Sequence, residues 1–425
     1  MPLDISLPRA VKEILDVLTD AGFEAFIVGG CVRDSILGRT PGDWDITTSA
    51  KPQQVKELFR RTVDTGIKHG TVTVMVGKTG YEVTTYRIDG AYEDGRHPDS
   101  VTFTPDLGED LRRRDFTINA MAWHPDRGLV DLFGGMEDLR RGMIRCVGQA
   151  DSRFEEDALR MMRAVRFAAQ LSFRIEENTA AAVRKNAPSL QRISAERIHA
   201  ELAKLLLSSH PDYIRDACDL RLTAVFLPEY DLMRGAGTEE ETLRCLKSIE
   251  PDQALRMAAL LSSFEEDDKA CAALAGRICR RLKMDNHTRG RIMQILTFRS
   301  LPLQSDERGV RKQLSLAGQE YYDDLLRLQR ARVMGYRPAD EAAQLSWIDE
   351  KEDLYRKIIR EGQPFSIRQL AVTGSDLMEQ GMEKGPRIGR TLQRLLNLVI
   401  EDPSMNSKEK LLAEAFAPDS GPGLL

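Results

Sequence analysis

The chain has no excess of positive charge. Its 61 lysines and arginines stand against 66 aspartates and glutamates, which gives a net charge of −5. A protein that binds nucleic acid through its overall charge is therefore excluded, and any such contact must come from local basic clusters. The six cysteines include no Cys-x-x-Cys pair, and the six histidines show no ligand spacing. This argues against a zinc site or a disulfide framework and favours a reducing compartment.

Long hydrophobic runs are also missing. No segment approaches the length that spans a bilayer, and the first residues lack the basic and apolar segments of a secretory signal. Hydrophobic residues make up 42% and charged residues 30% of the 425 positions, as in soluble globular proteins. We therefore expect a cytoplasmic protein with more than one structural unit.

The patterning predicts an α+β fold. Residues 9–20 show helical spacing of apolar residues, and strand-like runs follow at 24–28, 43–47, 71–76, 81–86, 101–104 and 129–133. Gly77 to Gly80 is typical of a hairpin turn. From about residue 150 strand signals vanish and helical periodicity dominates, as in 156–171, 195–207, 240–249 and 387–400. We expect a small mixed or antiparallel sheet with flanking helices at 1–148, followed by all-helical segments 149–208, 209–300 and 301–425.

The most informative motif is Gly29-Gly30 followed by Asp43-Trp-Asp45. Two carboxylates one residue apart on a strand point to the same side and repel each other unless a cation lies between them. Mg²⁺ is commonly held by one or two carboxylates together with substrate phosphates. Glycines let the backbone approach a triphosphate closely. Either element alone is commonplace, but their combination in this order predicts nucleotidyl transfer with Asp43 and Asp45 as metal ligands.

Two further motifs carry charges suited to phosphate. Arg33 follows the glycines and can offer a planar fork to phosphate oxygens, as can Arg114 in the run 111–122. The alternative for Arg33 is a helix start with a surface salt bridge. The alternative for the arginine run is a solvated helix face, which is the commoner origin of such runs. Glu82, in a strand of alternating polarity, is a candidate third carboxylate, although an ordinary exposed strand glutamate has the same pattern.

A second cluster follows in the helical part. Asp157, Arg160, Arg163 and Arg166 recur every three residues, so neighbours share one broad face of a predicted helix over 156–171. Asp157 and Arg160 match an i, i+3 ion pair that stabilises a helix. They also offer an acceptor and a donor edge that can read cytosine and adenine.

With these four motifs in order, the chain resembles the class II CCA-adding tRNA nucleotidyltransferases of the Bacillus type, in the polymerase-beta-type superfamily. The resemblance covers residues 23–210 and, more weakly, two C-terminal segments. It implies that Asp43 and Asp45 bind metal, that Glu82 is a further active-site carboxylate, and that Gly30, Arg33 and Arg114 contact the triphosphate. It also implies that Asp157 and Arg160 recognise the base, with Arg163 and Arg166 as companions. Loop 89–103 matches an element associated with switching from C to A addition, and 131–135 the junction of head and neck.

The family implies the activity: addition of CCA to the 3′ end of tRNA from CTP and ATP, without a nucleic-acid template, by two-metal transfer with Mg²⁺ and release of pyrophosphate. It also suggests a tRNA-binding tail and a homodimer. Three alternatives stay open, namely a bacterial poly(A) polymerase, an A-only-adding enzyme and, from another class, an inactive RNA-binding protein. The presence of loop 89–103 argues against CC-only addition.

The chain differs from the family pattern at two positions and carries two basic clusters outside the motifs. Leu132 stands where the family commonly has proline at the junction, which predicts a less rigid segment. His97 follows Arg96 where consecutive arginines are usual. Basic clusters at 277–291 and 308–312 are candidates for contact with tRNA phosphates, with solvated helix faces as the alternative.

Overall fold

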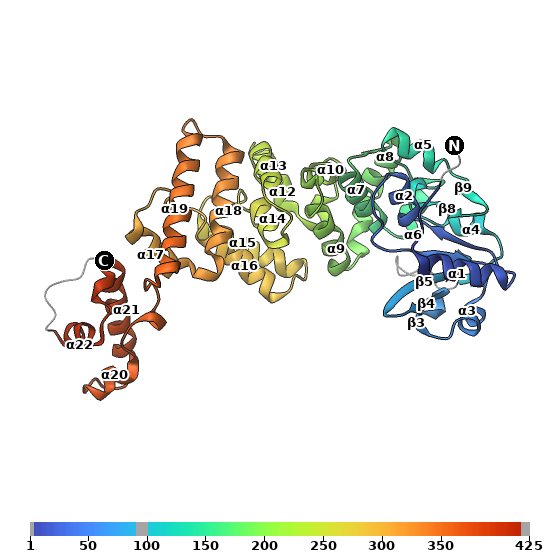
Figure 1. Cartoon of the computed structure of the whole chain (residues 1–425). Helices are drawn as coiled ribbons and strands as arrows, with labels where there is room; N and C mark the ends of the chain where they lie inside the picture. Colours follow the sequence, from blue (N-terminus) through green and yellow to red (C-terminus); the bar gives the residue numbers. More distant parts are fainter. Residues whose placement is uncertain (1–3, 91–100, 418–425) are drawn as a thin grey trace. The chain divides into compact units, whose positions relative to one another are not determined.

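The computed structural model describes residues 4–90 and 101–417, and the chain divides into two compact units, Met1–Leu232 and Met233–Leu425. The α+β fold class is confirmed, because the sheet lies entirely in the first unit and the second is helical (Figure 1). The finer division at 148, 208 and 300 stays a prediction. In the part of the chain that the structure describes, no helix combines the length and apolar character needed to cross a membrane.

The first unit contains a seven-stranded mixed sheet of order β3-β4-β5-β2-β1-β8-β9. Only β2 and β5 pair in parallel among these neighbours. The alternating apolar residues of the chain explain the buried face, on which Val72, Val74 and Val83 are fully covered. The strands are β1 (Ala25–Val28), β2 (Ile46–Thr48), β3 (Thr62–Gly66), β4 (Thr71–Val76), β5 (Thr79–Thr85), β8 (Met121–His124) and β9 (Gly128–Asp131).

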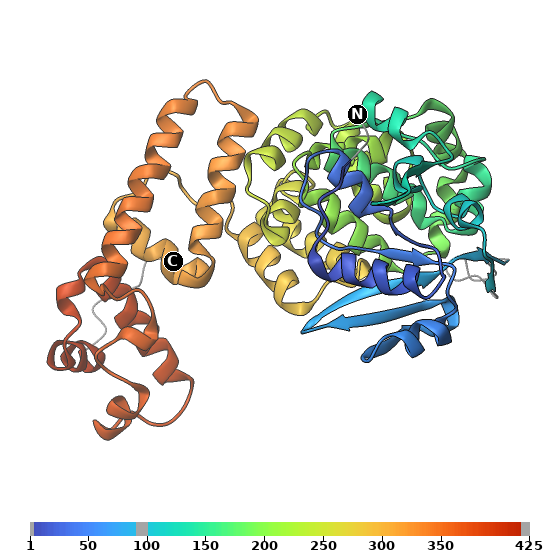
Figure 2. The ribbon, with the colours of Figure 1, turned by 45° about the vertical axis from the view of Figure 1, so that its right-hand side comes forward.

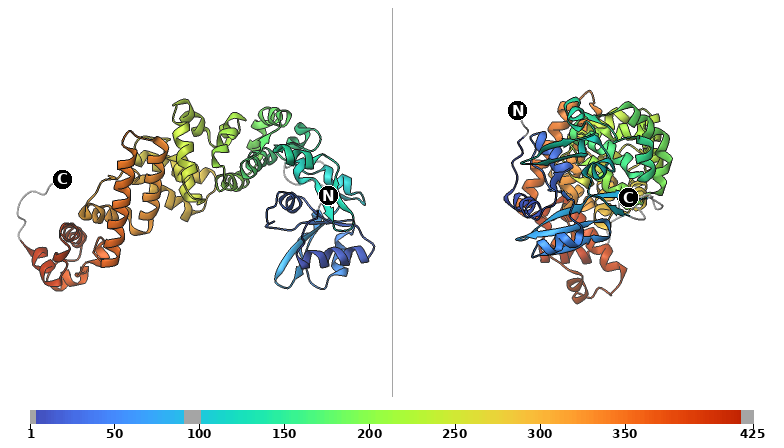
Figure 3. Two further views of the ribbon diagram at one scale, coloured as in Figure 1. Left: turned by 45° about the horizontal axis from the view of Figure 1, so that its top comes forward. Right: turned by 90° about the vertical axis from the view of Figure 1, so that its right-hand side faces the viewer.

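Helices cover this sheet and continue beyond it. Figures 1 and 3 show α3 against the strands at the blue end of the chain, where it packs on β4 and β5. The helices up to Phe226 are α1 (Arg9–Asp20), α2 (Gly30–Ile36), α3 (Pro52–Leu58), α4 (Leu107–Arg112), α5 (Gly135–Arg141), α6 (Ala150–Glu156), α7 (Leu159–Leu171), α8 (Glu177–Asn186), α9 (Ala195–Leu206), α10 (Ile214–Asp219) and α11 (Thr223–Phe226), with a 3₁₀ turn η2 (Thr117–Asn119).

Two small sheets were only partly expected. β6 (Arg87–Asp89) and β7 (Val101–Phe103) pair antiparallel and flank residues 91–100, which lie outside the described residues together with His97. β10 (Met143–Ile144) and β11 (Arg174–Ile175) form a parallel pair. The expectation that strands vanish from about residue 150 was therefore wrong at β11, because two residues are too few to leave a periodic signal.

The predicted helix over 156–171 was wrong at its start. α6 ends at Glu156, Asp157 adopts an extended conformation with φ −142° and ψ 103°, and α7 begins at Leu159. The carboxylate of Asp157 accepts a hydrogen bond from the backbone N–H of Leu159 at 3.0 Å. This contact satisfies a free donor in the first turn of α7, as aspartate does before many helices. Asp157 therefore does not share a helix face with the three arginines.

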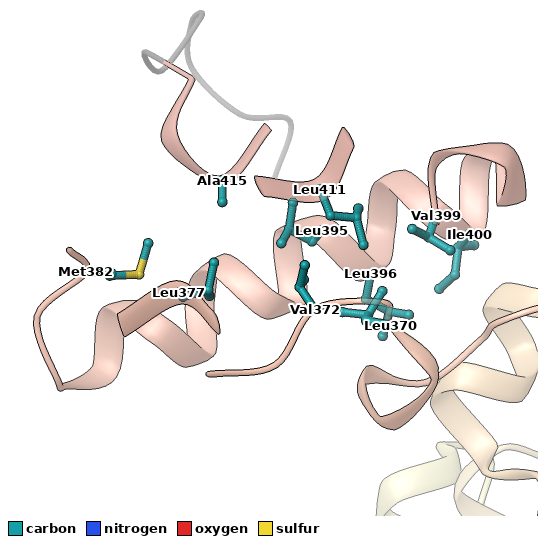
Figure 4. Close-up of a cluster of buried hydrophobic side chains, with 10 residues drawn as sticks. All are labelled: Leu370, Val372, Leu377, Met382, Leu395, Leu396, Val399, Ile400, Leu411 and Ala415. Carbon is teal, nitrogen blue, oxygen red and sulfur yellow. The ribbon is translucent and has the colours of Figure 1, made fainter. Parts of the chain in front are cut away.

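The second unit is built from α13 (Glu239–Ser248), α14 (Gln253–Leu261), α15 (Asp268–Arg281), α16 (Asn286–Thr297), α17 (Glu307–Ala317), α18 (Gln319–Tyr336), α19 (Glu341–Glu361), α20 (Gly374–Glu379), α21 (Pro386–Glu401) and α22 (Lys408–Phe416), while α12 (Pro228–Gly235) spans the boundary between the units. The orange helices α18 and α19 run side by side in Figures 1 and 2. A separate apolar cluster packs around α21 at the C-terminal end (Figure 4). Its buried members include Val372, Leu377, Leu395 and Leu411.

Candidate active site

The glycine turn after β1 is a place where the backbone needs glycine. Gly29 has φ +81°, a conformation that side chains rarely adopt. A Cβ built on Gly29 would also lie 3.1 Å from Nη1 of Arg114. Gly30 starts α2 without a positive φ, and its nearest neighbour, Nη2 of Arg33, would be 3.6 Å from such a Cβ. The turn therefore brings both predicted phosphate-binding arginines close to one stretch of backbone.

Asp43 and Asp45 precede β2 rather than lie on it. The strand begins at Ile46, so the prediction of a strand over 43–47 was wrong at its start, although the Asp45 carbonyl still accepts a hydrogen bond from Val28 N at 3.0 Å. Aspartate is depleted in strands because its short side chain competes for backbone hydrogen bonds. Both carboxylates nevertheless line one cavity of about 550 Å³, which Glu82 of β5 also lines.

The three carboxylates lie in one another's electrostatic field. The pKa of Asp45 is raised by burial and by Asp43, against the lowering effect of Arg114. The pKa of Glu82 is raised by partial burial and by both aspartates. Placing negative charges this close costs free energy, which a bound cation would relieve. The donor set is suited to a hard cation.

Asp43 and Asp45 are donors of the kind that a magnesium ion takes. Within the described ranges there is no group of three or more His, Cys, Asp or Glu side chains that could hold a metal by themselves. Mg²⁺ commonly takes one or two carboxylates and completes its shell with water and substrate phosphates. Asp43 and Asp45 match that requirement, since both open into the same cavity.

Arg33 is fixed in place by two residues that the sequence reasoning missed. Its Nη1 donates to Oδ1 of Asn119 at 2.6 Å, and its Nε and Nη2 donate to the carboxylate of Asp34 at 2.9 Å each. The side chain is 10% exposed. Asn119 lies in the run 111–122 that was singled out for its arginines, so its position there was the available signal.

Asp115 is a buried carboxylate behind this arrangement, and it was also missed. It accepts hydrogen bonds from Arg163 Nε at 2.8 Å and from Asn119 Nδ2 at 3.1 Å. Burial would raise the pKa of Asp115, but the Arg163 charge and the Asn119 hydrogen bond outweigh it and hold the pKa well below its usual range. Asp115 therefore joins Arg163 to Arg33 through Asn119.

Phe167 gathers three of the predicted arginines around its ring. The guanidinium carbons of Arg33, Arg163 and Arg166 lie 5.1, 5.2 and 4.0 Å from the ring centroid. Arg166 is buried against Glu201 of α9 at 2.8 Å, and burial lowers its pKa to about 10. Cations over an aromatic face are favoured by the ring's charge distribution. Tertiary packing thus brings Arg33 of α2 to two arginines of α7 that are far from it in the sequence.

Asp157 and Arg160 do not pair with each other. Asp157 forms an ion pair with Arg197 of α9 at 2.8 Å. Arg160 pairs with Glu156 at 2.6 Å and donates from Nη2 to the carbonyl of Arg113 at 3.1 Å. The i, i+3 ion pair expected from the spacing was therefore wrong. Because α6 ends at Glu156, Asp157 and Arg160 have partners on different elements, Arg197 of α9 for Asp157 and Glu156 of α6 for Arg160.

Comparison with known proteins places these features in a family. The family model "Poly A polymerase head domain" matches residues 25–145, "Probable RNA and SrmB- binding site of polymerase A" matches 172–233, and a tRNA nucleotidyltransferase domain 2 model matches 256–415. A CCA-adding enzyme of Pediococcus pentosaceus is 38% identical over 97% of this chain and 98% of its own length. That of Lactobacillus helveticus is 39% identical over 94% of both chains.

The chain belongs to the CCA-adding enzyme family.

The solved structures agree with this membership. The Bacillus stearothermophilus CCA-adding enzyme in complex with CTP has a TM-score of 0.77 and 32% identity, and the match covers 96% of this chain and 97% of that one. The Thermotoga maritima CCA-adding enzyme complexed with tRNA shares the fold, with a TM-score of 0.65 at 21% identity and coverage of 97% and 96%. The resemblance predicted from the motifs is confirmed, and the chain is an enzyme of the nucleotidyltransferase type.

Proposed function

We propose that this enzyme adds CCA to the 3′ end of tRNA from CTP and ATP, without a nucleic-acid template, and releases pyrophosphate. The observation that carries the proposal is the cavity shared by Asp43, Asp45 and Glu82, in a chain that matches CCA-adding enzymes over nearly its whole length. A likeness to structures with CTP and with tRNA supports the same partners.

The residues of the cavity suggest how the reaction proceeds. Divalent metal ions held by Asp43 and Asp45 would help to deprotonate the tRNA 3′-hydroxyl and to neutralise the leaving pyrophosphate. Arg33 and Arg114 lie beside the Gly29 turn, where their guanidinium groups suit the triphosphate. Glu82 adds negative charge to the same cavity. Most of the rate then comes from alignment and from charges that are fixed before the reaction.

Base selection is assigned to Asp157 and Arg160. In the described arrangement both side chains are occupied by protein partners, Arg197 for Asp157 and Glu156 for Arg160. Those partners hold the acceptor and the donor in place for a base edge. Arg163 and Arg166 contribute a cationic environment around Phe167. The enzyme then needs no RNA or DNA template, because the protein itself supplies the hydrogen-bonding groups that read the base.

Two related activities share this catalytic half. The head-domain match takes its description from poly(A) polymerases, so the carboxylates do not distinguish CCA addition from poly(A) synthesis. The match of residues 256–415 to a tRNA nucleotidyltransferase domain and the full-length relatives favour CCA addition. A-only addition is separated from full addition by experiment.

The test uses the purified full chain and tRNA truncated before its CCA end, with CTP, ATP or both, followed by sequencing of the product. We expect two cytidines with CTP alone and complete CCA with both nucleotides. Failure to add cytidine to tRNA that lacks CCA, together with addition of adenosine to tRNA ending in CC, would identify an A-only enzyme. Long adenosine tails would identify a poly(A) polymerase. No incorporation into any substrate would favour an inactive RNA-binding protein.

Two further predictions concern the setting of the enzyme. A homodimer is suggested only by the family, and sedimentation of the purified chain across a range of concentrations measures it. Cytoplasmic location follows from the substrate, because truncated tRNA occurs inside the cell, and fractionation of cells that express a tagged chain tests it.

A further inference from the structure

Asp110, the fourth residue of α4, is a carboxylate with no exposed surface. Its two oxygens serve different partners. Oδ1 accepts from Nε and Nη2 of Arg113 at 3.0 and 2.7 Å. Oδ2 accepts from Nη2 of Arg114 at 3.3 Å and from the hydroxyl of Thr47 at 3.2 Å. A buried carboxylate needs such partners, because an unpaired charge in the interior is costly.

The position of Arg114 makes this contact informative. Its side chain is 18% exposed, and its Nη1 would lie 3.1 Å from a Cβ on Gly29. Its charge lowers the pKa of Asp45, so the guanidinium also lies within electrostatic reach of the cavity. The buried Nε of Arg114 has no hydrogen-bond partner among the described residues. Within that part of the chain only Nη2 is anchored by a carboxylate, and Asp110 provides that anchor.

Thr47 connects the same carboxylate to β2, the strand that follows Asp43 and Asp45. It lies on β2, two residues after Asp45, and its side chain is fully buried. The single proton of the Thr47 hydroxyl is shared between Oδ2 of Asp110 at 3.2 Å and the carbonyl of Thr84 at 3.3 Å, and it links Asp110 to the backbone that follows the two aspartates. Burial would raise the pKa of Asp110, but the charges of Arg113 and Arg114 outweigh it and hold the pKa below its usual value. The residue is thus an anion between two arginines.

We propose that Asp110 is a positioning residue, which sets the guanidinium of Arg114 against the Gly29 turn so that it meets the nucleotide triphosphate. This rests on the proposed function, since it assumes a nucleoside triphosphate in the cavity. A charged group held before the substrate arrives loses less conformational freedom on binding, so the triphosphate binds more tightly. Asp110 itself touches no reacting atom.

The test measures CTP and ATP incorporation by Asp110→Asn in the full chain. We expect KM for both nucleotides to rise about tenfold, in the range found for supporting hydrogen bonds around a site, while kcat changes less than about threefold. In an Arg114→Ala background, adding Asp110→Asn should change KM by less than about twofold, because the residue acts through Arg114.

Asp138→Asn is the matched control. Asp138 is also a buried carboxylate of the first unit, but its arginine partner is Arg145, at 2.9 Å, and not the arginine that lies against the Gly29 turn. We expect its nucleotide KM to stay at the wild-type value. An equal rise in Asp138→Asn, an unchanged KM in Asp110→Asn, or the full effect persisting without Arg114 would each overturn the proposal.

A folding defect is separated by circular dichroism and by a second variant. If Asp110→Asn does not fold, Thr47→Val removes one hydrogen bond to the carboxylate at nearly constant volume, and KM should rise about two- to threefold. An unchanged KM in folded Thr47→Val would overturn the proposal. The wild-type reaction distinguishes a failure of the positioning role of Asp110 from a failure of the proposed function. Incorporation of CTP and ATP by the wild type with a normal KM in Asp110→Asn contradicts the positioning role alone.

Discussion

At the scale of single residues, a substitution of Asp45 is the most direct test of the proposed chemistry. It lines the cavity with Asp43 and Glu82 and carries a raised pKa, as expected for crowded carboxylates. Removing a direct metal ligand should cost more than removing a residue that only supports a ligand, for which 10–100-fold is typical. We expect Asp45→Asn to lower kcat for nucleotide addition at least about 100-fold.

Asp64→Asn is the control for this variant, because Asp64 is an exposed carboxylate paired with Lys56 at 3.0 Å on the edge strand β3. It should keep the wild-type rate. Wild-type activity in folded Asp45→Asn would contradict the assignment of Asp45 as a metal ligand.

Arg160 tests base selection. It lies in the first turn of α7, is 11% exposed and is held by Glu156. If it reads the base, Arg160→Ala should relax the preference for CTP and ATP over GTP and UTP by about 10-fold or more, since one good hydrogen-bonded contact contributes about 1–3 kcal/mol of discrimination. Competition assays with all four nucleotides measure it. Unchanged selectivity with a slower rate would assign Arg160 a structural role instead.

Lys351 offers a test of stability in the second unit. It is fully buried between α18 and α19, its Nζ donates to Pro302 O at 3.1 Å and to Gln329 Oε1 at 2.7 Å, and burial lowers its pKa to about 8. The unfolded chain binds more protons than the folded one between about pH 8 and the usual lysine pKa, so this group adds stability as pH rises through that window.

The size of that effect is on the order of 3 kcal/mol. Urea unfolding at pH 7.5 and pH 10 measures it, with Lys351→Met as the reference, because methionine does not titrate. Between pH 7.5 and pH 10, the free energy of unfolding should rise more in the wild type than in the variant. Equal pH dependence in both chains would mean that Lys351 titrates normally.

At the scale of elements, the start of α5 shows how closely the helices pack against the catalytic sheet. The Asp131 carboxylate accepts hydrogen bonds from the N–H groups of Gly135 and Met136 at 2.8 and 2.9 Å, which caps the helix. This cap lies in the 131–135 junction where Leu132 replaces the usual proline, and Leu132 itself is 59% exposed. These contacts tie the start of α5 to the end of β9.

Gly135→Ala is expected to destabilise the first unit. A Cβ there would collide with the carbonyl oxygen of Thr117 and lie 2.8 Å from Cγ of Met121. Crowding of this kind costs about 1–3 kcal/mol. Gly290→Ala in α16 is the matched control, since open space surrounds that helical glycine and alanine favours the helix by up to ~1 kcal/mol. Chemical unfolding measures both, and an equal free energy of unfolding in wild type and Gly135→Ala would contradict the packing argument.

Elements were predicted well where the periodicity was long and poorly where one side chain decides a boundary. α1 and β4 follow the expected ranges, since their apolar spacing is regular, and the predicted hairpin forms with β5 two residues earlier than expected. The break at Asp157 and the late start of β2 depend on single aspartates that bind nearby backbone or face a cavity. Periodicity averages over a window, so it misses such local competition.

At the scale of the whole molecule, the charge distribution limits where RNA can bind. The predicted cluster at 308–312 is partly structural, because Arg311 is buried and Arg308 pairs with Glu401. Arg291 is likewise held by Asp324 at 2.5 Å and by Asp252 at 2.9 Å. These ion pairs leave fewer unpaired cations in both clusters for RNA phosphates.

Lys283 and Arg289 remain candidates for phosphate binding, since no ion pair occupies either among the described residues. Neutralising one side chain that binds a phosphate should reduce the salt dependence of tRNA binding by a slope of about 0.7–0.9. We expect the double variant Lys283→Gln, Arg289→Gln to flatten the plot of log K against log salt by about 1 to 2. Arg356→Gln, an exposed arginine already paired with Glu352, is the control. Parallel plots would exclude both residues from the interface.

The sequence alone determined the fold class and the family, and it named candidate residues for the chemistry, because glycine turns, paired carboxylates and apolar periodicity are local properties of the chain. Tertiary structure decided how those residues are held. Asn119 and Asp115 join Arg33 to Arg163, and Asp110 accepts a hydrogen bond from Arg114 at the Gly29 turn. These partners are distant in the chain or indistinguishable from surface charges in it. An unpaired buried charge costs free energy, so each of these charged side chains has a partner. Which partner it has depends on the fold.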